Sequence, residues 1–321
     1  MNYGQTVCVI GVFDGVHLGH QYLISQAAIQ AEALGIPVLI ATFDRDPDEL
    51  FFPEQASRKL LSDDERLQRL ALAGFGSVPT SANDGGSKTT STSPIVLALP
   101  FNKELASLSP DDFLNQVLLK HCSPRAIHVG ADFRFGHKAS GDVSALSQWA
   151  IAHGAQVFGH HLLDDGGQPI TATRIRDALS SGNLEEANRL LTRPHHIAGT
   201  VVRGRGFGRD VGFPTANIAA TSGVMLPADG VYAGFLQCAD ELLPAAISVG
   251  VPLTFEGVQA TVEVYVLDYD GDLYDSQVVV YFVERLRPMI AFATVADLSN
   301  QIGKDVENSR RITTATRHML D

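Results

Sequence analysis

A short apolar run, followed by a glycine-rich turn and then a helical pattern, most strongly limits how this chain can fold. Residues 7–10 are continuously apolar, which is typical of a strand buried on both faces of a sheet. Residues 11–20 follow with the sequence GVFDGVHLGH, and apolar residues then recur at helical spacing as far as Leu34. The pattern predicts a strand, a turn and a helix, and it places His17 and His20 on one face of the first helical turn.

The start of that helix is expected to bind an anion. Unpaired backbone N–H groups and the positive end of the helix dipole point to the same place. Two imidazole donors beside it suit a phosphorus centre that gains negative charge during transfer, and Gly19 lets a ligand approach the backbone closely. Taken alone, the two histidines are more simply explained as surface side chains that cap an ordinary helix.

The first half of the chain continues to alternate strands and helices. Apolar runs at 38–43, 95–99 and 126–129 predict three further strands, with helical segments between and after them. Such alternation predicts an α/β fold with a parallel sheet, helices on both faces, and ligands at the carboxyl ends of the strands. The polar, low-complexity segment 76–94 is interpreted as a flexible surface loop.

The second half shows short alternating runs separated by turn residues. Asn183 followed by Glu186 predicts a capped helix, and a final helix is expected from about 295 to 311. The runs between the two helices predict an antiparallel barrel or sandwich, in which Asp270-Gly271 predicts a hairpin between the last two strands. The strands are expected at 200–203, 216–218, 230–236, 245–249, 261–267 and 277–282.

Length and charge limit the partners of the chain. Its 321 residues suit two domains, which we place at 1–186 and 187–321. The net charge of −12 at pH 7 argues against nucleic acid or a membrane as the main partner. The three cysteines show no paired spacing, and no apolar run reaches membrane-spanning length, so a cytoplasmic protein is expected.

Three more segments of the first half follow strands and are candidates for the same site as the histidines. They are residues 42–44 (TFD), residues 130–136 (GADFRFG) and the pair Thr173 and Arg176, which share a face of another helix's first turn. An arginine there can hold a leaving pyrophosphate with two parallel hydrogen bonds. Each segment alone has a plainer explanation, namely a strand-end turn, a simple turn, or a helix cap with a solvated arginine.

The second half carries its own candidate site. Residues 203–212 contain four glycines, as a loop that covers phosphates does. This signal is weak by itself, because flexible hairpins have the same composition. The sequence FPTAN follows, and Thr215 and Asn217 project to the same side of the predicted strand. Their hydroxyl and amide oxygens are hard, neutral ligands suited to a Mg²⁺ ion that bridges ATP phosphates. Glu263 lies in the middle of a later strand, where a carboxylate alone is most simply a solvent-facing group.

Together and in this order, the motifs resemble those of the bacterial bifunctional riboflavin kinase/FMN adenylyltransferases, also called FAD synthetases. The likeness covers roughly residues 5–312. It includes the family's Gly-x-Phe-Asp-Gly-x-His-x-Gly-His, Gly-x-Asp-Phe-x-Phe-Gly, Ile-Ser-Ser-Thr-x-x-Arg and Gly-Phe-Pro-Thr-Ala-Asn motifs. The chain departs from the family where Arg45 and Asp46 replace a proline and a histidine, and where Ala172 replaces a serine.

The resemblance implies two domains with different reactions. An N-terminal Rossmann-like nucleotidyltransferase domain would make FAD from FMN and ATP with release of pyrophosphate. A C-terminal antiparallel β-barrel riboflavin kinase domain with a terminal helix would make FMN from riboflavin and ATP. The implied ligands are riboflavin, FMN, FAD and ATP, the implied cofactor is Mg²⁺, and self-association is expected to be weak at most.

The resemblance also implies roles for individual residues. The catalytic residues would be Glu263, as the base of the kinase reaction, together with His17 and His20. The flavin-binding residues would be Asp132 and Phe133, and the metal ligands Thr215 and Asn217. The nucleotide- and phosphate-binding residues would be Gly11, Phe13, Asp14, Gly19, Thr173, Arg176, Gly208, Thr215 and Asn217.

Two alternatives remain open at this stage. The first is a riboflavin kinase whose N-terminal domain binds nucleotide but is weak or inactive in adenylylation, as the changes at Arg45, Asp46 and Ala172 suggest. The second is a flavin-binding regulatory protein built on two retired catalytic domains. The presence of Thr215, Asn217 and Glu263 together argues against the second, because a sensor has no need of a base.

Overall fold

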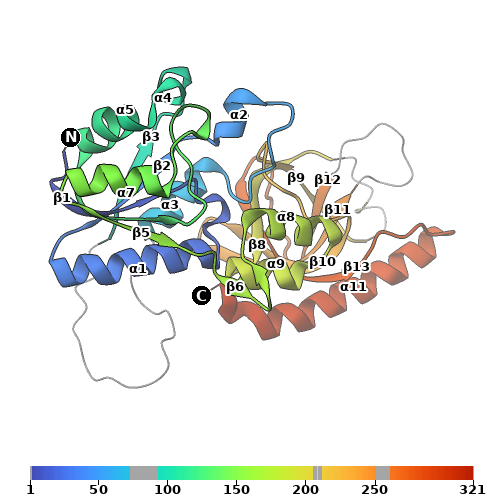
Figure 1. Cartoon of the computed structure of the whole chain (residues 1–321). Helices are drawn as coiled ribbons and strands as arrows, with labels where there is room; N and C mark the ends of the chain where they lie inside the picture. The colour runs from blue at the N-terminus through green and yellow to red at the C-terminus, as the bar shows by residue number, and fades with distance from the viewer. Residues whose placement is uncertain (1, 73–92, 205–207, 209–211, 251–260, 321) are drawn as a thin grey trace, which may run out of the picture. The chain divides into compact units, whose positions relative to one another are not determined.

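The computed structural model describes residues 2–72, 93–204, 208, 212–250 and 261–320 (Figure 1). The chain divides into two compact units. The first comprises Met1–Ser57 and Asp63–Thr171, and the second comprises Arg58–Ser62 and Ala172–Asp321. Residues 172–186 thus group with the second unit, and the domain limits at 186 and 187 stay a prediction. Nearly all of the predicted loop 76–94 lies outside the described residues.

The first unit contains a parallel five-stranded sheet in the order β3-β2-β1-β4-β5, which confirms the predicted Rossmann-like fold. The central strand β1 is buried from Thr6 to Ile10, as its apolar run requires. The strand β5 is not predicted, because its side chains are exposed or only half-buried and it has no continuous apolar run. The strands are β1 (Gln5–Ile10), β2 (Val38–Phe43), β3 (Ile95–Leu99), β4 (Ser123–Gly130) and β5 (Gln156–His160).

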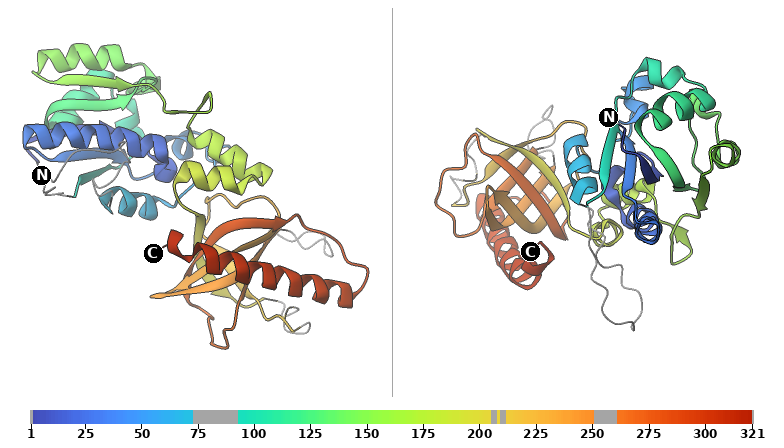
Figure 2. Two further views of the ribbon diagram at one scale, coloured as in Figure 1. Left: turned by 90° about the horizontal axis from the view of Figure 1, so that it is seen from below. Right: turned by 90° about the vertical axis from the view of Figure 1, so that its left-hand side faces the viewer.

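Helices cover both faces of this sheet (Figure 1 and Figure 2). On one face, α1 buries Leu23, Ile24, Ala27 and Ala31. On the other face, residues of α7 and of the helical segment 110–121 join β1, β2 and β4 in a continuous apolar core. The helices are α1 (Leu18–Leu34), α2 (Pro47–Phe51), α3 (Asp63–Leu72), α4 (Lys103–Ser107), α5 (Pro110–Asp112), α6 (Leu119–His121) and α7 (Val143–Ala152), with the turns η1 (Asp14–Val16), η2 (Phe113–Leu118) and η3 (His137–Ala139).

The second unit begins with two helices and continues into a closed barrel in the order β10-β11-β12-β9-β8-β13. The barrel is antiparallel throughout, so the sequence prediction is confirmed in its barrel form. The helices are α8 (Ala172–Ser181), α9 (Leu184–Leu191) and α11 (Val295–Thr316), followed by the turn η4 (Arg317–Met319). The strands are β8 (His195–Val202), β9 (Ala216–Ala220), β10 (Gly230–Cys238), β11 (Glu241–Gly250), β12 (Thr261–Val266) and β13 (Gln277–Arg287), while β6 (Asp164–Asp165) and β7 (Gln168–Pro169) form a small ribbon in the first unit.

The hairpin predicted at Asp270-Gly271 is wrong. Strands β12 and β13 are not neighbours, because β9 and β8 lie between them in the barrel. Hydrogen bonds at its two ends fix the connection between β12 and β13 instead. The Leu267 N–H donates to the Pro244 carbonyl of β11, and the Asp275 N–H donates to the Val201 carbonyl of β8. The connection therefore runs from the side of β11 to the side of β8. The Asp-Gly pair signals a local turn, whereas the pairing of the flanking strands is decided by barrel closure.

The terminal helix is also longer than predicted. Leu298 and Ile302 are half-buried, and the same helix face continues into the buried side chains of Asp305, Ser309 and Ile312, which follow at intervals of three and four residues. Arg287 of β13 forms a bidentate ion pair with Asp305, at 2.7 Å between its Nη2 and Oδ2, which accounts for the buried carboxylate.

A five-residue segment between α2 and α3 belongs to the second unit. Lys59 pairs with Val224 as a parallel bridge, its N–H donates to the Gly223 carbonyl at 2.8 Å, and its carbonyl accepts from Met225 at 2.8 Å. The chain therefore enters the second unit at residue 58 and returns to the first at residue 63 before its final passage at residue 172.

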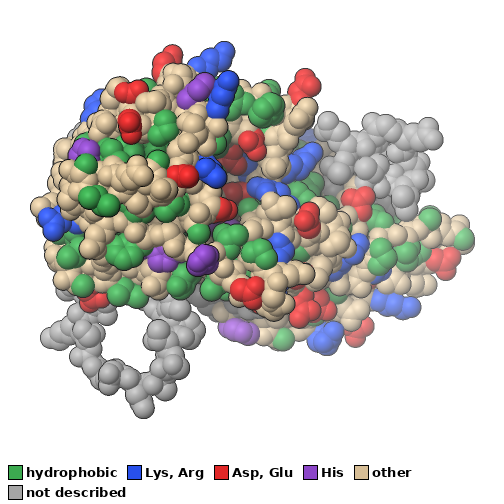
Figure 3. Space-filling model, viewed as in Figure 1, with side chains coloured by type: hydrophobic (Ala, Val, Ile, Leu, Met, Phe, Trp, Pro, Cys, Tyr) green, Lys and Arg blue, Asp and Glu red, His purple; other side chains and the backbone are tan. Residues whose placement is uncertain are grey.

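The charge distribution on the surface and the length of the helices concern the expected absence of nucleic-acid and membrane partners. On the described part of the face drawn in Figure 3, acidic and basic side chains are interspersed. Among the residues that the structure describes, the helices are all too short or too polar to cross a lipid bilayer.

Candidate active sites

The motif loop of the first unit joins the carboxyl end of β1 to α1. The Gly11 N–H donates to the Ala41 carbonyl of β2 at 3.2 Å, and Phe13 then adopts a left-handed backbone with φ of 61°. The predicted strand, turn and helix are confirmed, but His17 is the cap residue that precedes α1 and does not lie within its first turn. The loop is buried from Phe13 to His17, so its side chains are held by packing.

Two glycines of this loop make room for rings. A Cβ at Gly11 would lie 3.0 Å from the Phe13 ring, and a Cβ at Gly19 would lie 3.2 Å from the His17 ring and 3.4 Å from the Ile170 carbonyl. A contact at 3.0–3.4 Å would force the neighbouring ring to shift. Gly19 therefore admits the His17 ring, whereas the predicted approach of a ligand to the same backbone stays a prediction.

The two histidines lie against each other. Their rings stack with centroids 3.6 Å apart and an interplanar angle of 20°, and the Phe13 ring meets His20 edge-on at 5.2 Å. The Nδ1 atom of His20 is buried and has no hydrogen-bond partner among the described residues. Burial, together with the nearby His17 and Arg66, lowers the pKa of His20 well below its ordinary value. His20 is thus a neutral imidazole at neutral pH with hydrogen-bonding capacity left over.

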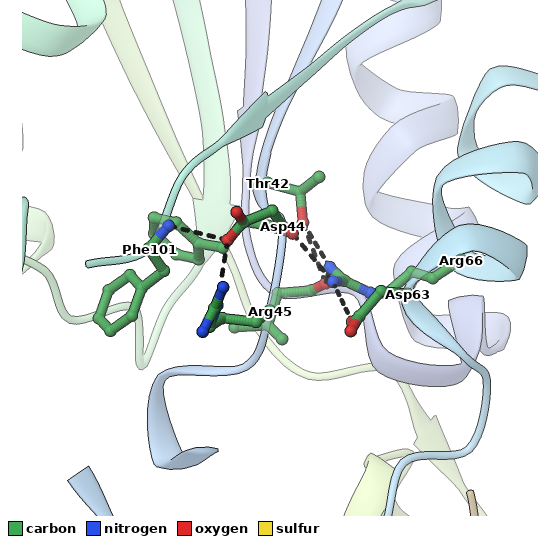
Figure 4. A network of polar contacts seen from close by, with 8 residues as sticks. Thr42, Asp44, Arg45, Asp63, Arg66 and Phe101 are labelled. Atoms are coloured by element: carbon green, nitrogen blue, oxygen red, sulfur yellow. Dashed lines mark hydrogen bonds and ion pairs between the residues drawn. The ribbon is translucent and has the colours of Figure 1, made fainter. Parts of the chain in front are cut away.

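Arg66, in the first turns of α3, is a residue that the sequence analysis missed. Its guanidinium donates to the carbonyls of Val12 (2.6 Å) and Phe43 (2.9 Å). It donates as well to Oγ1 of Thr42 at 2.8 Å (Figure 4). It also pairs with Asp63 at 2.9 Å. The only sequence signal was an arginine placed one turn after the aspartate that begins a helix, where the helix dipole disfavours a cation.

The segment after β2 is fixed mainly by Asp44. Its N–H donates to the Leu99 carbonyl, and its Oδ1 accepts from the Phe101 N–H at 2.8 Å (Figure 4). Arg45, which replaces the family's proline, is exposed and lies 3.7 Å from the Asp44 carboxylate. Asp46, which replaces the family's histidine, is the residue that precedes α2.

The proposed flavin loop follows β4, the neighbour of β1, so it leaves the same edge of the sheet as the motif loop. Phe133 is half-buried and stacks on Phe135, with centroids 5.5 Å apart and an interplanar angle of 13°. Asp132 is exposed beside it. Phe135 is anchored by two backbone hydrogen bonds with Gly141, which leaves Phe133 as the outer ring of the pair.

Thr173 and Arg176 lie on α8, in the second unit. Thr173 is exposed, and Nε of Arg176 donates to the Arg58 carbonyl at 2.8 Å. The neighbouring Arg174 is instead engaged with Glu186 of α9. Because α8 belongs to the other unit, the place of Thr173 and Arg176 with respect to the histidines stays a prediction.

In the barrel, the three predicted kinase residues come together. Thr215, just before β9, donates its hydroxyl to Oε2 of Glu263 on β12 at 3.3 Å, and Asn217 is the register partner of Glu263. A Cβ at Gly204 would displace the Asn217 side-chain amide. A Cβ at Gly208 would overlap the Phe213 backbone carbonyl, so position 208 needs glycine. The rest of the glycine-rich loop, at 205–207 and 209–211, lies outside the described residues.

A small cavity of about 120 Å³ opens beside Thr215. Its walls include Val264 of β12 and the aromatic residues Tyr269 and Tyr274 of the connection to β13. Arg203 lies over the Tyr274 ring at 4.9 Å from its centroid. The cavity walls combine apolar side chains and two aromatic rings with polar groups of Thr215 and Asp272, a combination that suits a flat heterocycle whose polar end reaches Thr215.

The oxygen donors at this place fit a hard divalent cation. The described ranges contain no group of three or more histidine, cysteine, aspartate or glutamate side chains that could hold a metal ion. The hydroxyl of Thr215, the amide of Asn217 and the carboxylate of Glu263 nevertheless converge. Mg²⁺ is commonly bound by few protein oxygens when phosphates complete its coordination.

Comparison with known proteins assigns both halves. The model of the FAD synthetase family matches residues 1–82 and 92–174, and the model of the riboflavin kinase family matches residues 191–313. The bifunctional riboflavin kinase/FMN adenylyltransferase of Pseudomonas fluorescens is 33% identical over 313 residues, covering 97% of this chain and 94% of that protein. The Escherichia coli K12 protein of the same name is 32% identical, covering 95% of this chain and 91% of that protein.

A crystal structure described as a macrolide-efflux protein from Streptococcus pneumoniae has the same architecture. Its TM-score is 0.81 at 30% sequence identity, and the match covers 97% of this chain and 95% of that one. The match spans both units.

Proposed function

The chain belongs to the family of bifunctional riboflavin kinase/FMN adenylyltransferases, and we propose that each of its units performs one of the two reactions. The barrel converts riboflavin and ATP into FMN and ADP. The unit with the parallel sheet converts FMN and ATP into FAD and pyrophosphate. The observation that carries the proposal is the convergence of Thr215, Asn217 and Glu263 in the barrel, since a carboxylate beside two neutral oxygen donors suits phosphoryl transfer to a hydroxyl.

In the kinase reaction the nucleophile is a neutral ribityl hydroxyl, so a base within reach helps. Glu263 takes the proton, the hydroxyl oxygen bonds to the γ-phosphorus of ATP, and the bond from that phosphorus to the bridging oxygen of ADP breaks. Because Thr215 donates its hydroxyl proton to Glu263, its lone pairs remain available to a cation. Mg²⁺ would be held by Thr215 and Asn217 and would neutralise charge on the phosphates.

We place the nucleotide of the kinase reaction in the cavity beside Thr215. Tyr269 and Tyr274 offer ring faces on which the adenine of ATP can stack. Thr215, a proposed metal ligand, lines the same cavity, so the phosphates of ATP would extend from the adenine toward the metal site. Gly208, whose missing side chain allows close backbone packing against Phe213, is assigned to the nucleotide phosphates.

Adenylyl transfer needs no general base, because the phosphate of FMN is already anionic at neutral pH. A phosphate oxygen of FMN bonds to the α-phosphorus of ATP, and the bond from that phosphorus to pyrophosphate breaks. The neutral His20, with its spare ring nitrogen, and the start of α1 supply donors at the phosphates. Phe133 and Asp132 are assigned to the flavin, and Thr173 and Arg176 to the leaving pyrophosphate, where Ala172 supplies one hydroxyl fewer.

The experiment that tests the proposal is an assay of the purified full chain with riboflavin, ATP and Mg²⁺, with FMN and FAD separated by chromatography. Formation of both flavins is expected, and chelation of the metal should stop it. FMN alone would select a riboflavin kinase with an inactive first unit, and no product would favour a flavin-binding regulator. A cytoplasmic location stays a prediction, supported by the free thiols of Cys8, Cys122 and Cys238, as does weak self-association.

A further inference from the structure

Arg66 lies at a position that is unfavourable for an arginine in two respects, burial and the helix dipole. Its side chain is 1% exposed, and it stands in the first turns of α3, close to the positive end of that helix. Burying a guanidinium is costly unless its donors are all engaged, and a cation at this end of a helix is disfavoured. Hydrogen bonds from the guanidinium to the motif loop and to β2 offset these costs.

The guanidinium joins the motif loop to the neighbouring strand. One terminal nitrogen donates to both the Val12 carbonyl at 2.6 Å and the Thr42 hydroxyl at 2.8 Å, and the other donates to the Phe43 carbonyl at 2.9 Å. Figure 4 shows Arg66 beside Thr42. The Thr42 hydroxyl itself donates to Val12 at 3.1 Å. A planar fork can engage acceptors on two segments at once, whereas a lysine ammonium on a flexible stem cannot reproduce that geometry.

The anchored carbonyl is one residue away from the histidine site. Val12 precedes Phe13, which has a left-handed backbone and whose ring packs against His20 in a T-shaped arrangement, with centroids 5.2 Å apart. His20 in turn stacks on His17. A shift of the Val12 carbonyl would therefore move the Phe13 ring and, with it, the imidazole pair. The positive charge of Arg66 also acts on His20 directly, because it contributes to the lowered pKa of that ring.

We propose that Arg66 is a positioning residue for adenylyl transfer, which sets the Val12–Phe13 backbone and thereby holds His20 at the phosphate site. This rests on the function proposed above for the first unit. Arg66 itself touches neither substrate nor reacting atoms, since its donors are engaged by Val12, Thr42, Phe43 and Asp63.

The test uses Arg66→Met and Arg66→Lys in the full chain, with Arg125→Met as the matched control. Arg125 is an exposed arginine at the opposite end of the same sheet, near the start of β4. In Arg66→Met we expect kcat for FAD formation from FMN and ATP to fall by about 10²-fold, with a much smaller change in KM, because positioning is lost while the binding groups remain. Arg66→Lys should recover only part of the loss, and FMN formation by the barrel should be unchanged in all three.

A second readout does not depend on activity. In the wild-type chain, the ring signals of His20 are followed by NMR against pH and assigned from a His20→Gln sample. Arg66→Met should shift these signals and raise the pKa of His20, since a nearby cation is removed. Arg66→Lys keeps the charge but loses the planar fork, so it should still shift the ring signals. A purely structural role in α3 would lower the unfolding temperature and leave the His20 signals of folded Arg66→Lys unmoved.

The outcomes separate the two proposals. A wild-type chain that makes no FAD defeats the proposed function, while the His20 signals still decide the role of Arg66. An active wild type and a folded Arg66→Met with unchanged kcat, or with unchanged His20 signals, overturns the role of Arg66. Where Arg66→Met does not fold, Thr42→Val replaces it, because this variant keeps the shape of the side chain and removes the hydroxyl between Arg66 and Val12. A smaller loss of kcat in the same direction is then expected, and an unchanged kcat overturns the proposal.

Discussion

Replacing Glu263 by glutamine separates the chemistry of the barrel from its architecture. Glu263 is half-buried in β12, and its carboxylate accepts a long hydrogen bond of 3.3 Å from the Thr215 hydroxyl. Glutamine keeps a side-chain oxygen that can accept from Thr215, so the free energy of unfolding should change by less than about 1 kcal/mol. Glutamine cannot accept the ribityl proton, and the rate of FMN formation should fall by about 10²–10⁴-fold, the usual contribution of a general base.

The assay measures FMN formation from riboflavin and ATP, with thermal unfolding recorded on the same sample. Glu284→Gln is the matched control, since Glu284 is an exposed glutamate on strand β13 of the same barrel. When FMN is supplied directly, Glu263→Gln should form FAD at the unmutated rate, because the phosphate nucleophile arrives deprotonated. A folded Glu263→Gln protein that phosphorylates riboflavin at close to the full rate would refute the assignment of the base.

Other substitutions test the remaining contacts. His20→Ala should lower FAD formation by about 10²–10³-fold while FMN formation is nearly unchanged, and an equal loss of both activities would contradict separate sites. Gly204→Ala should raise the Mg²⁺ concentration needed for FMN formation, because the new methyl group displaces the Asn217 amide; an unchanged metal titration would count against Asn217 as a ligand. Burial and the nearby His160 lower the pKa of His128 to about 4, so the unfolded chain binds more protons below pH 6.5 and the unfolding temperature should fall as the pH drops toward 4. His128→Gln should weaken that dependence, and an identical dependence in both proteins would exclude His128 as its source.

Much of the fold follows from local patterns, and its exceptions have physical causes. The strands β1, β2 and β4 are predicted because burial on both faces requires apolar runs, and the edge strand β3 is predicted because it keeps such a run although it is only partly buried. The other edge strand, β5, has neither a continuous apolar run nor much burial. The strand β8 begins at His195, five residues before the predicted start at 200, because two buried histidines and Gly199 interrupt the apolar pattern. Pairing partners depend on closure of the whole barrel, which is why the Asp270-Gly271 signal misleads.

In the candidate sites, too, local motifs predict some residues, and only the tertiary structure reveals others. The sequence motifs locate the histidine pair and the group of Thr215, Asn217 and Glu263, because these residues lie in short, ordered motifs. Arg66 is invisible to that reasoning, since its function arises from three acceptors on two other segments that only tertiary structure brings together. Charged residues on helices are ordinarily solvated, so the one local sign in α3, an arginine in its first turns where the helix dipole disfavours a cation, is too weak to predict a buried side chain.

The short segment 58–62 determines how this enzyme can be dissected genetically. Its backbone is hydrogen-bonded to Gly223 and Met225 in the second unit, yet it is encoded in the middle of the first. A fragment that ends at 171 would keep these five residues without their partners, and a fragment that begins at 172 would lack the strand pairing that Lys59 gives Val224. Each truncated product would therefore differ from the unit that it is meant to represent. Substitutions in the intact chain are the sounder way to assign the two activities.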